Sequence, residues 1–199
     1  MTSTLSPAEI YRRSFTFIQE KMGLDNSLKS SIITRVVHAT ADFEIGKSMV
    51  FSSSFEDSLS AIEEGSIAIA DINMVMSGIS RYNNKKCYIG DNDIIREAKR
   101  TGISRSYLSM SRACRDNPEA IYVIGDAPTA LEALIDSIDA GICFPRLVIG
   151  VPVGFVSALE MKSRLLAFQG NFITNISNKG GSAVAASIFN AMVAYLHVY

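Results

Sequence analysis

The chain contains two histidines, His38 and His197, and only His38 lies in a strongly patterned segment. It follows Val36 and Val37 on a predicted helix, so a rigid element could present its imidazole as a proton donor. The alternative is a structural role, because a lone histidine beside an apolar stripe is more often a hydrogen-bonded core residue. Since His197 lies in the C-terminal tail, the sequence predicts no metal site.

Two segments place arginine next to serine, and both the guanidinium and the hydroxyl can donate hydrogen bonds to a carboxylate. Arg13 and Ser14 lie in the first predicted helix, and Ser104 and Arg105 open another. Serine is a common helix cap, whereas a cation at a helix start is disfavoured by the helix dipole unless an anion joins it. We therefore take all four as candidate ligands for an acidic group, with solvated surface as the alternative.

Three glycine-containing turns precede predicted helices and could present backbone N–H groups to an anion. Tight corners between strands and helices are the alternative explanation. The third turn is not a Walker A loop, which places its lysine after the second glycine, so a nucleotide site is only weakly indicated. The turns cover residues 125–130, residues 150–155 and residues 178–182, and the last contains Lys179, Gly180 and Gly181.

Asp71 follows an apolar run at residues 67–70, and Met74 and Gly78 come shortly after it. Its carboxylate could cap the next helix or form the wall of a pocket, and the cap is the safer interpretation. In open parallel sheets, ligands bind beyond the carboxyl ends of the strands. Asp71 and the turns above therefore mark one probable binding edge.

Other kinds of chemistry lack support in the sequence. There is no G-x-S-x-G elbow, no cysteine near a histidine and no carboxylate pair with a clear rationale. Cys87, Cys114 and Cys143 are widely spaced and include no C-x-x-C pair, which predicts reduced core thiols rather than a disulfide framework or a zinc site. The candidate residues therefore favour ligand binding, with proton donation by a side chain such as His38, over covalent catalysis.

Charge and hydropathy exclude some partners. Nineteen Lys and Arg nearly balance twenty Asp and Glu, for a formal charge of −1, so no general attraction to nucleic acid or to an anionic membrane is expected. No apolar run reaches the roughly 18 residues needed to span a bilayer, and the N-terminus lacks a signal-peptide pattern. We expect a cytoplasmic protein.

The elements that must position these residues alternate between strands and helices. With 199 residues and 48% hydrophobic content, we expect one domain covering residues 1–199. Long connections between runs that are apolar on both faces predict a three-layer α/β/α fold with a mainly parallel five-stranded sheet. The expected helices include residues 7–22, 27–41 and 54–65, residues 49–51 are a possible edge segment, and the strands are residues 67–70, 86–89, 121–124, 146–149 and 172–174.

Taken in order, these motifs resemble the precorrin-8X methylmutases, the isomerases of corrin-ring biosynthesis. The resemblance covers essentially the whole chain, and many matches in the correct order are more specific than any one. The matching segments are residues 11–15, 35–39, 71–79, 104–106, 124–131, 150–156 and 179–182. The chain departs from the usual family pattern at Asp126, where Asn is usual, at Ser104, where Thr is usual, and at Met161, where Ser is usual.

The resemblance implies an intramolecular shift of a methyl group from C-11 to C-12 of a tetrapyrrole, precorrin-8X or cobalt-precorrin-8, without a cofactor. It implies that His38 protonates or hydrogen-bonds a ring nitrogen next to the migration site. Ser14, Ser104 and Arg105 would bind the acid side chains of the ring. The further implied ligands are Arg13, Asp71, Met74, Gly78, Lys179, Gly180 and Gly181.

The resemblance also implies a flavodoxin-like fold and a homodimer with the site near the subunit interface. Two other functions remain open at this point. One is a tetrapyrrole carrier that uses the same fold without turnover, and the other, based on fold analogy alone, is a flavin- or nucleotide-binding module.

Overall fold

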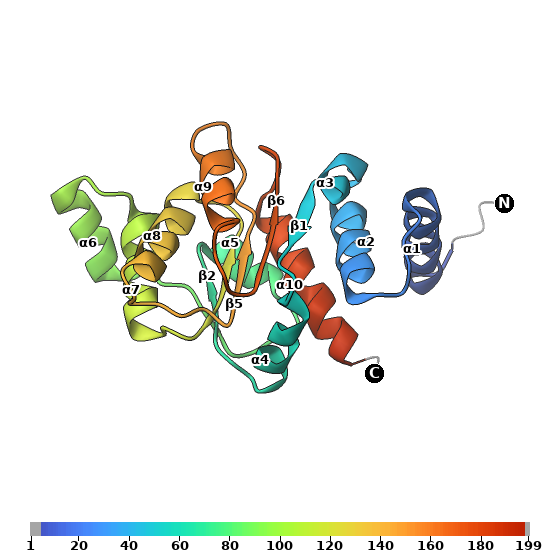
Figure 1. Cartoon of the computed structure of the whole chain (residues 1–199), viewed down its shortest axis with the longest axis horizontal. Helices are drawn as coiled ribbons and strands as arrows, with labels where there is room; N and C mark the ends of the chain where they lie inside the picture. Colours follow the sequence, from blue (N-terminus) through green and yellow to red (C-terminus); the bar gives the residue numbers. More distant parts are fainter. Residues whose placement is uncertain (1–4, 198–199) are drawn as a thin grey trace.

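A six-stranded sheet forms the centre of the molecule, in a computed structural model that describes residues 5–197 (Figure 1). The strand order is β1-β6-β5-β4-β2-β3, and every neighbouring pair is parallel except β1 with β6. The strands are β1 (Met49–Phe51), β2 (Ala68–Ala70), β3 (Lys85–Lys86), β4 (Ile121–Ile124), β5 (Leu147–Gly150) and β6 (Phe172–Asn175).

Helices cover both faces of the sheet. Every residue of β2, β4, β5 and β6 is buried, which is what a parallel sheet with two covered faces requires. The helical segments are α1 (Pro7–Met22), α2 (Leu28–Thr40), α3 (Phe43–Lys47), the 3-10 turn η1 (Phe55–Ser58), α4 (Leu59–Glu63), α5 (Asn73–Gly78), α6 (Asn92–Thr101), α7 (Arg105–Asp116), α8 (Pro128–Asp139), α9 (Ala158–Leu165) and α10 (Ser182–Leu196).

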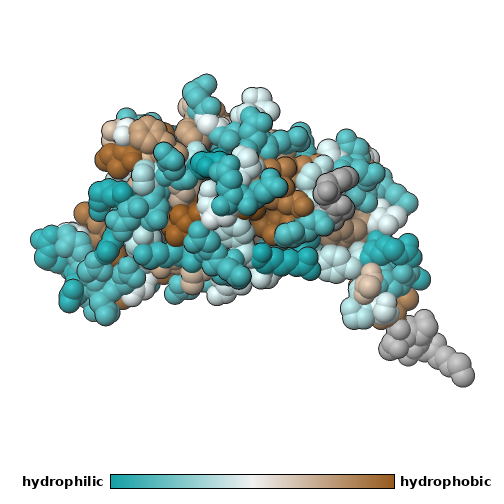
Figure 2. All heavy atoms as spheres, turned by 90° about the horizontal axis from the view of Figure 1, so that it is seen from below, coloured by the Kyte–Doolittle hydropathy of each residue, from teal (hydrophilic) through white to brown (hydrophobic). Residues whose placement is uncertain are grey.

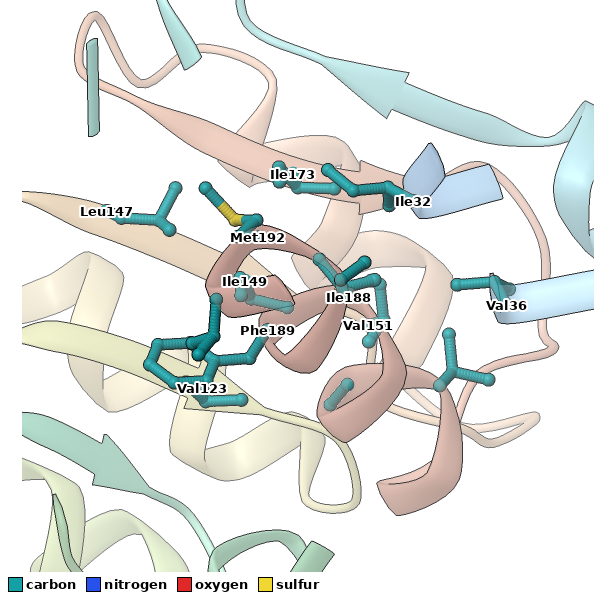
Figure 3. Packing of buried hydrophobic residues seen from close by; sticks show 14 of the residues in the cluster. Ile32, Val36, Val123, Leu147, Ile149, Val151, Ile173, Ile188, Phe189 and Met192 are labelled. Atoms are coloured by element: carbon teal, nitrogen blue, oxygen red, sulfur yellow. The ribbon is translucent and has the colours of Figure 1, made fainter. Parts of the chain in front are cut away.

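The side chains of each strand alternate between two cores. One core joins the sheet to α7, α8 and α9, and the other joins it to α2, α5 and α10. In the second core, Ile188, Phe189 and Met192 of α10 lie between the strands and α2 (Figure 3). Each of these three side chains is fully buried, which stabilises the fold by roughly 1.5–3 kcal/mol per side chain. Helix α10 therefore holds α2 in place against the sheet.

Helices α1 and α2 form where the sequence predicts them. Ser6 caps α1 by accepting the N–H of Glu9 at 3.2 Å, and Gly23 ends it in the left-handed conformation. The Glu9 carboxylate pairs with Arg12 and Arg13. Helix α2 contains His38, as the sequence predicts.

The prediction of five strands is wrong, because residues 49–51 form a sixth strand that pairs antiparallel with β6. This edge segment is too short for its three residues to show an alternating pattern. Two other expectations change in length. The strand expected at residues 86–89 is only Lys85–Lys86, and the helix expected at residues 54–65 is divided into η1 and α4.

The two glycine-containing turns after β4 and β5 differ, although the sequence predicts the same design for both. After β4, only residues 125–127 separate the strand from α8. After β5, seven residues form an irregular loop before α9 begins at Ala158, and Ser157 has a φ of 61°. The loop cannot tighten because its backbone bonds to another loop, with the N–H of Gly154 donating to the carbonyl of Asn178 at 3.1 Å.

Candidate active site

The imidazole of His38 is held between α1 and α2. Its Nδ1 lies 2.7 Å from the hydroxyl oxygen of Ser14. The rings of Tyr11 and Phe15 pack on it, with centroid separations of 4.6 and 5.2 Å. His38 is half-buried and hydrogen-bonded, so its imidazole is not enclosed in the core. The ring is fixed in orientation but still reachable.

This arrangement selects one nitrogen of His38 for chemistry. Ser14 engages Nδ1, and within residues 5–197 no partner is present at Nε2. If the Ser14 hydroxyl donates, Nε2 carries the proton of the neutral ring; if the ring is protonated, both nitrogens carry one. In both of these states Nε2 can donate a hydrogen bond to a ligand, whereas in the neutral tautomer with its proton on Nδ1 the ring donates to Ser14 and Nε2 accepts.

A loop after β6 approaches the end of α2 that carries His38. The ammonium of Lys179 lies 2.6 Å from a carboxylate oxygen of Asp42, four residues beyond His38. This hydrogen bond lowers the pKa of Asp42. Asp42 also caps α3 through the N–H groups of Glu44 and Ile45. The contact joins the helical end that carries His38 to the carboxyl edge of the sheet.

Gly180 and Gly181 are fixed by contact with the loop after β5. A Cβ on Gly180 would lie 2.1 Å from the carbonyl oxygen of Val151, so only glycine fits there. The N–H of Gly181 donates to that same oxygen at 3.0 Å, and it is not available to a ligand. Of the two amide groups expected to bind an anion, Gly180 alone retains a free N–H among the described residues.

Asp71 caps a turn other than the one the sequence suggests. Its buried carboxylate accepts the N–H groups of Gly125, Asp126 and Ala127 at 3.2, 2.8 and 2.9 Å. Burial raises the pKa of Asp71, and these three hydrogen bonds oppose that shift. The anion position of the turn after β4 is thus occupied by the protein's own carboxylate. An external phosphate cannot use it, which weakens the flavin or nucleotide interpretation.

Ser104 and Arg105 lie beside the same edge of the sheet. The hydroxyl of Ser104 is 2.9 Å from that of Thr129, at the start of α8, so it does not cap its own helix. Arg105 is exposed and has no hydrogen bond or ion pair within residues 5–197. Its guanidinium is therefore free to bind a carboxylate beside the β4 turn.

Two of the expected substrate ligands make structural contacts within the chain. Arg13 is exposed and donates to Glu9 at 2.7 Å, and together with Arg12 it lowers the pKa of Glu9 to about 2. Gly78 packs against α10, where an added Cβ would lie 2.7 Å from the side chain of Ala186. The structure therefore gives no contact of Arg13 or Gly78 that points to a ligand.

Large apolar side chains are exposed on the loops and helix starts around this edge. Met74 is 69% exposed on α5. The sequence marks residues 150–156 as a turn and a family motif, but it assigns no role to their apolar side chains. The exposed set is Met74, Ile103, Val153, Phe155, Val156 and Ile176.

The opposite end of the sheet has a different surface. Figure 2 views that end, and hydrophilic side chains cover most of it, with separate apolar patches between them.

Within residues 5–197, no three His, Cys, Asp or Glu residues are grouped so as to hold a metal ion. No helix in that range is both long and apolar enough to cross a membrane.

Comparison with known proteins gives a consistent answer. The protein-family model described as CbiC, precorrin-8X methylmutase, matches residues 9–195. The cobalt-precorrin-8 methylmutase of Priestia megaterium is 40% identical over 198 residues, which cover 95% of this chain and 88% of that protein. The enzyme of the same name from Methanocaldococcus jannaschii is 42% identical over 171 residues, covering 85% and 81% of the two chains.

A solved structure supports the same assignment. The precorrin-8X methylmutase of Thermus thermophilus superposes with a TM-score of 0.84 at 30% identity, covering 93% of this chain and 94% of that one. Together with the matched motifs and the position of His38, these likenesses show that the chain belongs to the precorrin-8X methylmutase family.

Proposed function

We propose that this isomerase converts precorrin-8X or cobalt-precorrin-8 into hydrogenobyrinate or cobyrinate. In this reaction the bond from the methyl group to C-11 breaks as the bond to C-12 forms, within one molecule. Such a shift requires the ring to be held in a reactive shape and the product tautomer to be stabilised. It requires neither a nucleophile nor an electron donor, and we propose no cofactor.

The fixed imidazole of His38 is the observation that carries this proposal. Ser14 on one nitrogen and two aromatic rings on its faces leave Nε2 to meet the substrate. We assign to Nε2 the protonation, or hydrogen bonding, of the ring nitrogen beside the migrating methyl group. Ser14 then acts through His38 by orienting the imidazole.

The carboxyl edge of the sheet supplies the groups that hold the rest of the ring. Arg105, Ser104 and the N–H of Gly180 would bind acid side chains of the tetrapyrrole. The exposed apolar side chains around Met74 would lie against the macrocycle. The mostly parallel sheet supports this location, because ligands of open parallel sheets bind beyond the carboxyl ends of the strands.

We infer that the enzyme is a homodimer joined through α1. This helix packs mainly on α2, and it buries only Ile18 although Ile10, Tyr11 and Phe17 are each more than 40% exposed. It lies at one end of the molecule, on the far side of α2 from the sheet (Figure 1). Because Tyr11 also contacts His38, a second subunit on α1 would complete the site.

Replacement of His38 by alanine tests the proposed function. We expect His38→Ala to bind the coloured corrin product within about tenfold of the wild-type affinity, while conversion of substrate falls by at least about a hundredfold. Absorbance spectra of the protein mixed with precorrin-8X, and separately with its cobalt form, measure both quantities. Wild-type protein that binds both tetrapyrroles but converts neither would be a carrier, and the proposal would be wrong.

A further inference from the structure

A buried lysine lies beneath the loop that carries Gly180. Lys162 on α9 is 1% exposed, and no carboxylate within residues 5–197 pairs with it. Its ammonium donates to the side-chain oxygen of Asn175 at 3.2 Å, to the carbonyl of Lys179 at 2.9 Å and to the carbonyl of Ser177. Burial lowers its pKa to about 8, so it remains mostly charged at neutral pH. An uncompensated buried charge is costly, which suggests a use beyond packing.

The contacts of Lys162 orient one peptide group. The carbonyl of Lys179 accepts from both the Lys162 ammonium and the side-chain amide of Asn175, the latter at 3.0 Å. In a trans peptide the N–H points opposite to the carbonyl, and the described chain contains no cis peptide. The N–H of Gly180 is therefore directed away from the buried ammonium. It makes no hydrogen bond within residues 5–197.

Other contacts prevent this peptide from rotating. The carbonyl of Val151 lies against Gly180 and accepts the N–H of Gly181, while the N–H of Gly154 donates to the carbonyl of Asn178. The Lys179 side chain is held by Asp42, near the end of α2. The free N–H thus belongs to a fixed loop on the side of the molecule where His38 lies.

We propose that Lys162 is a positioning residue for substrate binding, which orients and polarises the Lys179–Gly180 peptide so that the Gly180 N–H donates to a carboxylate side chain of the tetrapyrrole. This inference rests on the proposed function and adds to it a residue that does not touch the substrate. A cation on the carbonyl side of a peptide strengthens its N–H as a donor, and hydrogen bonds to charged acceptors are the stronger kind.

The test compares an acidic ligand with a neutral one. Cobyrinate and its fully amidated form are titrated into wild-type protein and Lys162→Met, and corrin absorbance gives each affinity. We expect the variant to lose about tenfold in affinity for cobyrinate and less than about twofold for the amide. Arg164→Met is the matched control, because Arg164 lies on the same helix but pairs with Asp136 and Asp139 at the surface. It should change neither affinity.

An equal loss for both ligands, or no loss for cobyrinate, would overturn the inference. If Lys162→Met does not fold, Lys162→Gln retains a donor without the charge and is measured in the same way. In the wild-type protein, cobyrinate should also move the amide proton resonance of Gly180 downfield more than its amide does. If the wild type converts substrate but that resonance stays fixed, only the inference about Lys162 fails. If it binds neither corrin, the proposed function fails as well.

Discussion

At the scale of single residues, the site depends on how neighbouring groups orient the imidazole of His38 and the backbone N–H of Gly180. The resemblance implies that Ser14 binds an acid side chain of the ring, and the structure places its hydroxyl 2.7 Å from Nδ1 of His38. We propose that Ser14 orients the imidazole. The sequence assigns no role to Lys162, yet its contacts orient the peptide of Gly180.

Loss of the Ser14 hydroxyl should slow the reaction without weakening binding. In Ser14→Ala, the imidazole loses the partner that fixes its orientation, at a cost of about 1 kcal/mol, which lowers kcat about fivefold. KM should stay within about twofold, as measured by steady-state conversion at several substrate concentrations. Ser163→Ala is the control, since Ser163 is exposed and its hydroxyl bonds only within its own helix. A large rise in KM with kcat unchanged would instead place Ser14 on the substrate.

Burial of Lys162 should make stability depend on pH. Its pKa is about 8 in the folded protein and 10.5 ordinarily, so between these values the unfolded chain carries more protons at this position. The free energy of unfolding of the wild type, relative to Lys162→Met, should therefore rise from pH 8 to pH 10.5. Urea unfolding of both proteins across this range measures the difference. A difference that falls with pH would contradict the assignment.

At the scale of elements, the turn between β4 and α8 is organised by a residue from a different strand. Asp71 follows β2, and its carboxylate bonds the three N–H groups of residues 125–127. Strands β2 and β4 are neighbours in the sheet, so the contact spans the point where flavodoxin-like folds bind their ligand. In this protein that point is filled, and the ligand is expected farther along the edge, toward Gly180 and α2.

Removal of the Asp71 carboxylate should destabilise this turn. Asp71→Ala leaves three N–H groups without this acceptor, of which that of Gly125 is buried, and should lower the free energy of unfolding by about 3 kcal/mol. Added formate, which can replace the lost carboxylate, should restore part of the loss. Asp126→Ala is the matched control, because its exposed side chain lies in the same turn and makes no hydrogen bond within residues 5–197. Urea unfolding with and without formate provides the measurement, and equal formate effects on both variants would refute the capping role.

At the scale of the whole molecule, packing brings α2 and the sheet edge together. Helix α10 lies between α2 and the strands. The Asp42–Lys179 ion pair joins the segment after α2 to the loop after β6. Helix α1 has less support, since it packs mainly on α2 and carries exposed apolar side chains. A second subunit would cover that surface.

Charge placed on α1 should therefore disrupt the dimer. Phe17 is 58% exposed on α1, and Phe17→Glu would bury a carboxylate in the proposed interface, which we expect to weaken association at least about tenfold. Phe144→Glu is the matched control. Phe144 is 64% exposed, and it does not belong to α1 or to α2, the helix on which α1 mainly packs. Light scattering over a dilution series measures the oligomeric state. If Phe144→Glu alone dissociates the protein, the interface lies elsewhere.

Local sequence signals are enough to predict several of the helices and strands. Helices α1 and α2 have capping residues and apolar faces, and the buried strands are continuous apolar runs, so their positions depend on neighbours in the chain. The family motifs also identified His38 and the loops at the carboxyl edge before any contact was known. The three-residue β1 carried no comparable signal, because it becomes a strand only by pairing with β6.

Long-range packing sets how the side chains of the site are used. Which acceptor fills the β4 turn and which nitrogen of His38 is free depend on partners dozens of residues away, and the direction of the Gly180 peptide depends on Lys162, 17 residues before Lys179. Asp71 is 54 residues from Gly125, and Ser14 is 24 residues from His38. Hydrogen bonds of this kind depend on distances of about 3 Å between atoms that only packing brings together, and spacing along the chain does not encode them.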